Sequence, residues 1–134
     1  MQYTCGIFLI TKDCKVLLSH PTNGVDNIWH IPKGLTELNE TFENAAIREF
    51  KEETNIDLDI ENLIYINEVK YKNKDKKLIA FKYYTELNSF DFNPICYSMV
   101  NLPNGVSFPE NDKFIFVDIN DVNKYLHYTQ QNLI

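Results

Sequence analysis

The sequence has little of what marks several protein classes. Its 134 residues include four glycines, five prolines and three cysteines, which excludes a collagen, a disordered tail and a disulfide-stapled miniprotein. Strictly apolar stretches such as 7–10 and 16–18 fall far short of the roughly 20 residues that a membrane-spanning helix needs. The first residues carry no basic region followed by an apolar run. We therefore expect no secretory signal, no membrane partner and a cytoplasmic location.

Positive charge is also scarce. Lysine and arginine total 13 against 19 aspartates and glutamates, which gives a formal net charge of −6, and Arg48 is the one arginine. A phosphate backbone rewards a basic surface. This balance therefore excludes a general nucleic-acid coat protein, although it permits a local basic patch.

The three cysteines are odd in number and show no metal-ligand spacing. Cys5, Cys14 and Cys96 each stand among apolar or strand-forming neighbours. We interpret all three as reduced thiols that serve as small buried hydrophobes.

What is present indicates one domain, 1–134, because 44% apolar residues suffice for a single core. Apolar runs, breakers and capping residues predict the order of the elements. They predict strands at 3–10 and 15–20 around a polar turn at 11–14, an ordered loop at 21–33, a helix from 41 to about 54, strands at 63–71 and 77–86 around a charged tip at 72–76, an irregular segment at 90–109, a strand at 114–117, a terminal helix capped by Asp118 or Asn120, and a further turn at 129–133. This order predicts the α+β class, with a mixed β-sheet packed between helices.

The helix predicted after residue 41 separates an apolar face from an acidic face. Thr41 is the expected N-cap. At about 100° per residue, Phe42, Ala46 and Phe50 follow one another at four-residue intervals and form the stripe that faces the core. Ala45 is expected in the acidic arc, where its small side chain leaves room above the carboxylates.

Three glutamates, Glu49, Glu52 and Glu53, stand at i, i+3 and i+4 and share one arc of this helix. A run of this kind is most often a solvated face. Two features favour a metal site instead. Glu53 points close to the buried stripe, where an unpaired carboxylate is costly, and Arg48 precedes Glu52 by four residues and can brace it. Grouped carboxylates suit Mg²⁺ or Mn²⁺, which also keep waters or substrate phosphates as ligands.

A wider pattern surrounds these acids, made of Gly34, Glu40, Arg48, Glu49, Phe50, Glu52, Glu53, Asn55 and Ile56. At this spacing the set resembles the Nudix box of the Nudix hydrolases. The resemblance covers most of the chain, including the segment 29–34 (Trp-His-Ile-Pro-Lys-Gly) and the segment 109–112 before the last strand. The departure is Asn55, where the pattern has glycine. We expect Asn55 to end the helix with a positive φ, which asparagine tolerates best among the other residues.

The resemblance implies hydrolysis of a nucleoside diphosphate linked to another group, on the Nudix α/β/α sandwich, with Mg²⁺ or Mn²⁺ as cofactor. It also implies roles for single residues. By this resemblance, Glu49 and Glu53 are the principal metal ligands, and the Gly34 carbonyl completes the metal shell. Glu52 is a ligand or the catalytic base, and Arg48 belongs to the catalytic group. Glu40 holds the loop and the helix in register, and Lys33 contacts a phosphate. Glu110 is a candidate for the acid that several family members bring from outside the box, with an ordinary loop glutamate as the alternative.

The substrate is suggested by the segment 29–34, which is similar to that of diadenosine polyphosphate hydrolases and related nucleotide pyrophosphatases. Tyr71 lies near the position where the former carry a tyrosine. We therefore expect a dinucleoside polyphosphate or a (d)NTP as the nucleotide substrate. Tyr71 and Tyr83 are candidates for stacking on a base, with core packing as the alternative for both.

Five lysines crowd the predicted tip and its flanks: Lys70, Lys72, Lys74, Lys76 and Lys77. A solvated hairpin tip is the usual interpretation. The functional alternative is a guide for polyphosphate or for a 5′-triphosphorylated RNA end, which would make the protein an RNA 5′-end pyrophosphohydrolase. The net negative charge favours the solvated tip. A third hypothesis, a non-catalytic nucleotide sensor, is disfavoured by the complete acidic set. We assign no histidine to catalysis and leave the oligomeric state open.

Overall fold

The computed structural model describes residues 1–134. Its strands and helices are β1 (Gln2–Ile10), β2 (Lys15–Pro21), β3 (Lys33–Leu35), α1 (Phe42–Thr54), β4 (Ile64–Lys70), β5 (Lys76–Tyr84), β6 (Met99–Asn101), β7 (Ser107–Pro109), β8 (Asn111–Asp118) and α2 (Val122–Tyr125). Short 3₁₀ turns lie at Ile60–Asn62, Ser89–Asp91, Ile119–Asp121 and Tyr128–Gln130. None of the helices has the length and apolar character needed to span a membrane.

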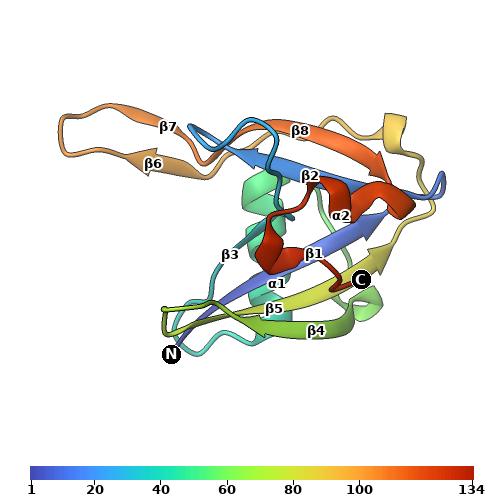
Figure 1. Ribbon diagram of the computed structural model, residues 1–134, viewed down its shortest axis with the longest axis horizontal. Helices are drawn as coiled ribbons and strands as arrows, with labels where there is room; N and C mark the ends of the chain where they lie inside the picture. The colour runs from blue at the N-terminus through green and yellow to red at the C-terminus, as the bar shows by residue number, and fades with distance from the viewer.

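The main sheet has the strand order β4-β5-β1-β2-β8, with β3 beside β1 (Figure 1). β1 runs parallel to β5 over its whole length, from Gln2 opposite Lys76 to Ile10 opposite Tyr84. On its other edge β1 pairs antiparallel with β3, and then with β2 at Ile10. This split pairing places the Gly34 backbone beside β1 and against α1, which contacts β3.

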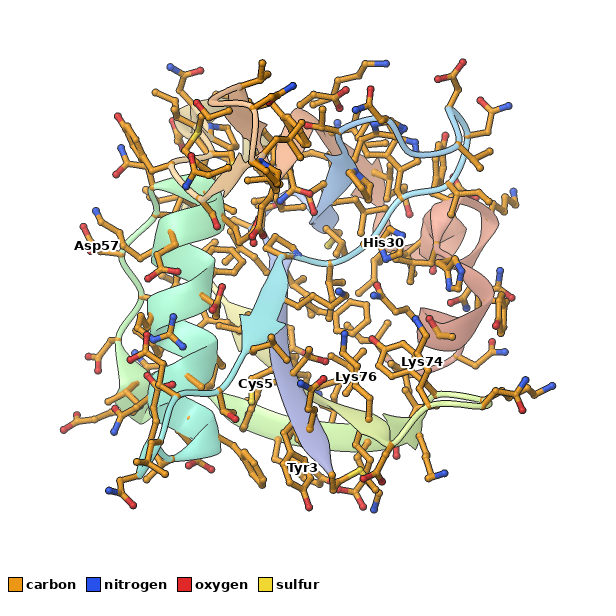
Figure 2. The ribbon with its side chains drawn as sticks, turned by 90° about the vertical axis from the view of Figure 1, so that its left-hand side faces the viewer. Tyr3, Cys5, His30, Asp57, Lys74 and Lys76 are labelled. Atoms are coloured by element: carbon orange, nitrogen blue, oxygen red, sulfur yellow. The ribbon has the colours of Figure 1, made fainter.

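Apolar clusters cover both faces of the sheet, because successive side chains of a strand point to opposite sides. Ile7 and Leu9 of β1 pack in the cluster that contains α1 residues, whereas Phe8 and Ile10 pack in the cluster that contains Val122 of α2. Figure 2 shows α1 on one side of the strands and the C-terminal segment on the other. The α+β prediction, with a mixed sheet between helical layers, is confirmed.

α1 begins and ends where the sequence predicts. Thr41 is the N-cap, and its Oγ1 accepts a hydrogen bond from the Asn44 N–H at 3.1 Å. Asn55 follows the last turn with φ 61° and ψ 24°, and its N–H donates to the Lys51 carbonyl. The predicted positive φ at Asn55 is confirmed.

The predicted apolar stripe of α1 is wrong at Phe42, and the buried face is wider than predicted. Ala45, which was expected in the acidic arc, is also fully buried in the core, because the buried face of an amphipathic helix is a wide arc rather than one row. Phe42 is 36% exposed. Its ring lies 5.0 Å from that of Tyr3, near the start of β1 and away from the centre of the core.

The segment 90–109 contains a hairpin, β6–β7, where the sequence analysis expected irregular structure. It projects from the body of the molecule (Figure 1). The Leu102 N–H donates to the Val106 carbonyl, and Gly105 has φ 85°. The dipeptide Asn104-Gly105 is a strong hairpin signal, but the prolines around it suggested a broken segment.

Other boundaries also differ from the prediction. β3 was not predicted, and β8 begins three residues before the expected strand at 114–117. The terminal helix is a single turn, α2. Asp118 caps the 3₁₀ turn before it by accepting a hydrogen bond from the Asn120 N–H.

The prediction that all three cysteines are buried is only partly correct. All three thiols are free, Cys5 is buried and Cys96 is half-buried. Cys14 is exposed with φ 60° in the turn between β1 and β2. The tight turn requires a left-handed residue there, and the turn lies in solvent.

The left-handed cap at Asn55 predicts the effect of two substitutions on stability. Asn55→Gly should be neutral or stabilising, because glycine adopts this backbone without strain. Asn55→Val should lower the free energy of unfolding by about 1 kcal/mol or more. Thermal melts of both variants measure this, and a valine variant as stable as the wild type would contradict the assigned helix end.

Candidate active site

The acidic face of α1 combines two buried carboxylates with an open one. Glu53 is 1% exposed and Glu49 is 8% exposed, whereas the side chain of Glu52 is 44% exposed. Burying a carboxylate without a positive partner is costly. The buried pair therefore needs either a protein cation, a proton or a bound metal ion.

Arg48 is the protein cation of this face. Its Nε and Nη2 donate to the two oxygens of Glu40 at 2.7 and 2.9 Å, a bidentate pair. Its Nη1 donates to Glu49 at 2.9 Å and reaches Glu52 at 3.3 Å, while Nη2 also donates to the Leu35 carbonyl. The bond to Glu40 raises the pKa of Arg48 and lowers the pKa of Glu40. The guanidinium thus ties the loop before α1 to the acidic face.

Glu53 is the deepest acid. Its Oε2 accepts a hydrogen bond from Asn111 Nδ2 and lies 3.8 Å from the Sγ of Cys96. Burial, followed by the neighbouring Glu110 carboxyl, raises the pKa of Glu53 to about 9. Burial also raises the pKa of Glu49. A site that holds carboxyls so far from their ordinary pKa gains strongly from a bound cation.

A side chain at position 34 would displace a carboxylate of the acidic face. A Cβ built on Gly34 would collide with the carboxylate of Glu49. The requirement is close approach rather than unusual backbone, because the φ of Gly34 is not positive. The carboxylate of Glu49 therefore lies directly against the backbone of β3.

The donor set suits a hard divalent cation. The donors are carboxylate oxygens, from Glu49, Glu52, Glu53 and Glu110. Mg²⁺ and Mn²⁺ prefer such ligands, and when bound here either ion would shield the charge of a pyrophosphate and activate water. In this structure, no group of three acidic, histidine or cysteine side chains lies close enough together to coordinate one metal ion. Arg48 and Asn111 hold the carboxylates in this arrangement.

Three hollows meet at Lys33, which lines each of them. The acidic hollow, of about 500 Å³, is also lined by Gly34, Arg48, Glu49, Glu52 and Glu110. The arm hollow, of about 270 Å³, is also lined by Ser19, His30, Glu53, Val100, Phe108 and Glu110. The lysine hollow, of about 290 Å³, is also lined by His30, Tyr71, Lys72, Lys74, Lys76 and His127. Burial, followed by the charge of Lys76, lowers the pKa of Lys33.

Lys72 and Lys74 at the tip of the β4–β5 hairpin are exposed, which agrees with the expected solvated tip, whereas Lys76 is half-buried. Lys72, Lys74 and Lys76 line the lysine hollow, and Lys76 also lines the acidic hollow. In Figure 2, Lys74 and His30 lie on the side of the sheet away from α1. Lys77 lines none of the hollows and lies 3.5 Å from Glu68. The hollow forms because the tip lies beside His127, Tyr128 and Thr129, which the spacing of the lysines alone does not reveal.

The two candidate tyrosines have different positions. Tyr71 lines the lysine hollow, with the Nζ of Lys76 5.4 Å from its ring centroid. Tyr83 is 9% exposed in the core beneath α1, and its hydroxyl accepts a hydrogen bond from the Asp59 N–H. The structure does not bring Tyr83 to the site.

Several lining residues escaped the sequence analysis. Val100 and Phe108 reach the arm hollow from β6 and β7. The Asn104-Gly105 dipeptide is the sequence signal that could have predicted this hairpin. His30 lines two hollows, but a lone histidine in a loop carries no signal of its own.

Known proteins resemble this chain in sequence and in fold. An RNA pyrophosphohydrolase of Campylobacter jejuni is 25% identical over 127 residues, which cover 90% of this chain and 77% of that protein. A structure of a C. elegans Ap4A hydrolase superposes with a TM-score of 0.69 at 22% identity, covering 99% of this chain and 92% of that one. The E. coli dihydroneopterin triphosphate pyrophosphohydrolase superposes with a TM-score of 0.71 at 17% identity, covering 98% and 91%. Both structural likenesses concern the fold.

The family comparison covers almost the whole chain. The NUDIX domain model matches residues 2–131. This range contains the acidic face of α1, Gly34 and all three hollows. The chain therefore belongs to the Nudix family, and it is a pyrophosphohydrolase of that family.

Proposed function

We propose that this chain hydrolyses a pyrophosphate linkage in a nucleoside polyphosphate, with a dinucleoside polyphosphate or a (d)NTP as substrate and Mg²⁺ or Mn²⁺ as cofactor. One observation carries the choice of substrate: Lys33 joins the acidic hollow to the lysine hollow. A chain of phosphates fits this neighbouring pair, because one linkage can lie at the carboxylates while further phosphates lie over the lysines.

The residues of the acidic hollow divide the work in this proposal. Glu49 and Glu53 are the principal ligands of the cation, and Glu110 lies close enough to Glu53 to join them. Glu52 is the candidate base, because it is the most exposed of the three helix acids and has access to water. Arg48 keeps the ligand carboxylates oriented through its bonds to them.

The nucleoside has a place in the arm hollow. Val100 and Phe108 supply apolar and aromatic surface there, within the same hollow as Glu53. A base that packs against them leaves its phosphates near Lys33.

We place the reaction in the cytoplasm, a reducing compartment that suits three free thiols.

An RNA 5′ end is the second candidate substrate, favoured by the similarity to an RNA pyrophosphohydrolase. A 5′-triphosphate presents the same phosphate chain to the site. RNA differs from a small nucleotide beyond the triphosphate, because RNA adds a backbone that must be held by further cations. The net charge of −6 opposes such a long polyanion.

A substrate panel separates these candidates. Products are identified by chromatography for diadenosine tetraphosphate, dNTPs and triphosphorylated RNA, with Mg²⁺ and with Mn²⁺. We expect the highest kcat/KM for a small nucleotide, with a shallow dependence on salt. A preference for RNA with a steep salt dependence would assign the enzyme to RNA ends, because each backbone contact releases counterions. No turnover of any compound would favour a nucleotide sensor.

Two adjacent lysines test the lysine hollow. Lys76→Gln should raise KM for the preferred polyphosphate about tenfold, because it removes a charge-assisted contact from a half-buried position. Lys77→Gln is the matched control, since Lys77 lines none of the hollows, and should change KM less than about twofold. Equal effects of the two substitutions would show that the hairpin acts only through general charge.

A further inference from the structure

Gln130 is a fully buried side chain whose two polar ends face different partners. It lies at the end of the 3₁₀ turn Tyr128–Gln130 and is 0% exposed. Its Oε1 accepts a hydrogen bond from the Ile31 N–H at 2.8 Å, and its Nε2 lies 3.2 Å from the Nδ1 of His30. A backbone N–H can only donate, so the oxygen must face Ile31 and the amide nitrogen must face His30.

The orientation of Gln130 fixes the proton of His30. An amide nitrogen donates and does not accept, so Nδ1 of His30 is the acceptor and the ring proton lies on Nε2. No buried side-chain nitrogen or oxygen lacks a hydrogen-bond partner, and Nε2 has none within the protein. Nε2 is therefore accessible from outside. Because His30 lines the arm hollow and the lysine hollow, its Nε2–H is a free donor at their junction.

The ring of His30 is held rigidly. Its backbone N–H donates to the Ser19 carbonyl and its carbonyl accepts from the Ser19 N–H, at 2.9 and 2.8 Å. The ring of His127 stacks on it at 5.1 Å between centroids. Burial first, then Lys33 of β3, His127 and His20 of β2, lower the pKa of His30 to about 4. The imidazole is therefore neutral at pH 7.

We propose that His30 is a phosphate-positioning residue, whose neutral Nε2–H donates to a non-bridging oxygen of the polyphosphate chain, and that Gln130 sets the tautomer that makes this possible. The inference rests on the proposed function, because it names a contact of the same substrate. Lys33 supplies charge at this point and His30 supplies direction. A neutral donor orients a phosphate without adding a cation that would compete for the carboxylates.

Gln130→Glu tests the tautomer. The new carboxylate still accepts a hydrogen bond from the Ile31 N–H. Its second oxygen faces Nδ1 of His30 and can only accept, so at high pH the ring proton moves to Nδ1. Nε2 then carries no proton and faces the substrate as an acceptor. One proton added to the pair restores Nε2–H. We therefore expect kcat/KM to fall about tenfold at pH 8 and to recover as the pH falls toward 6, a limb that the wild type lacks. A profile parallel to that of the wild type would overturn the proposal.

Two substitutions of His30 itself provide a test that does not depend on the folding of the first variant. His30→Gln keeps a neutral N–H donor near the position of Nε2, whereas His30→Leu removes it at similar size. We expect KM for the preferred polyphosphate to rise about tenfold in the leucine variant and less than threefold in the glutamine variant. Equal KM values in both would contradict a donor role.

NMR of the ¹⁵N-labelled wild type reads the tautomer without any turnover. We expect the His30 ring to carry its proton on Nε2 at pH 7, and we expect inorganic triphosphate to shift the resonance of that nitrogen. A proton on Nδ1, or no shift with triphosphate, would overturn the proposal. If the enzyme turned over no nucleotide while the tautomer and the shift were found, the proposed function would fail and the phosphate contact would stand.

Discussion

Glu53→Gln is expected to lower kcat at least about a hundredfold, the scale for losing a metal ligand or a positioned base. Glu53 is the most deeply buried acid of the α1 face. Its amide replacement keeps an acceptor for Asn111, so the fold should persist. Glu52→Gln should have an effect of the same scale. Steady-state turnover at saturating substrate and Mg²⁺ measures both.

Glu43→Gln is the matched control, because Glu43 lies in the first turn of the same helix and lines none of the hollows. It should change kcat less than about twofold, since an exposed charge near a helix N-terminus affects mainly stability. Comparable losses in Glu43→Gln and Glu53→Gln would mean that net charge, and not the site, controls the rate.

The same Glu53→Gln substitution should not destabilise the protein in EDTA. The pKa of Glu53 rises from 4.5 to about 9 on folding. Between these values the folded protein keeps a proton that the unfolded chain has lost, so the wild type loses stability as the pH rises through this window. A neutral amide escapes this loss. At pH 7.5 we therefore expect a Tm at or above that of the wild type, and a much lower Tm would indicate damaged packing instead.

Gly34→Ala should lower kcat by about a hundredfold with little change in Tm. The added Cβ takes the place of the Glu49 carboxylate. The end of a flexible side chain can move aside at small cost to stability, but a displacement of about 1 Å in a catalytic group has a large effect on rate. Turnover and a thermal melt of the same preparation measure the two effects.

Gly105→Ala gives the opposite pattern and serves as the control for Gly34→Ala. Gly105 has φ 85° in the β6–β7 turn, and a Cβ there would meet no neighbouring atom. The strained backbone should reduce stability by about 1 kcal/mol, while kcat stays within about twofold. If Gly34→Ala lost stability and activity in the same proportion as Gly105→Ala, its effect would be one on folding.

The sequence predicted the parts of the site that lie close together along the chain. Helical spacing alone grouped Glu49, Glu52 and Glu53, and the cap at Asn55 followed from its tolerance of positive φ. These inferences depend on local geometry, which 3.6 residues per turn determines. The same argument failed for Phe42, because burial at the end of a helix depends on what the sheet places beneath it.

The parts that the sequence did not reveal depend on contacts between distant segments. Gln130 meets His30 only because the C-terminal 3₁₀ turn packs beside the loop after β2. The lysines of the β4–β5 tip become part of a hollow through the same packing. Tyr83 shows the reverse case, since a strand aromatic that was a candidate for base stacking belongs to the core.

The most direct test of the account is a ³¹P NMR time course of the wild-type protein with its preferred nucleoside polyphosphate from the panel. With Mg²⁺ present, the resonances of the intact substrate should be replaced by those of two products, each with a new terminal phosphate where one P–O–P linkage was cleaved. Addition of EDTA should stop the conversion, and excess Mg²⁺ should restart it at the original rate. Conversion that continued unchanged in EDTA, or intact resonances for every compound of the panel, would contradict cation-dependent pyrophosphate hydrolysis at the acidic face of α1.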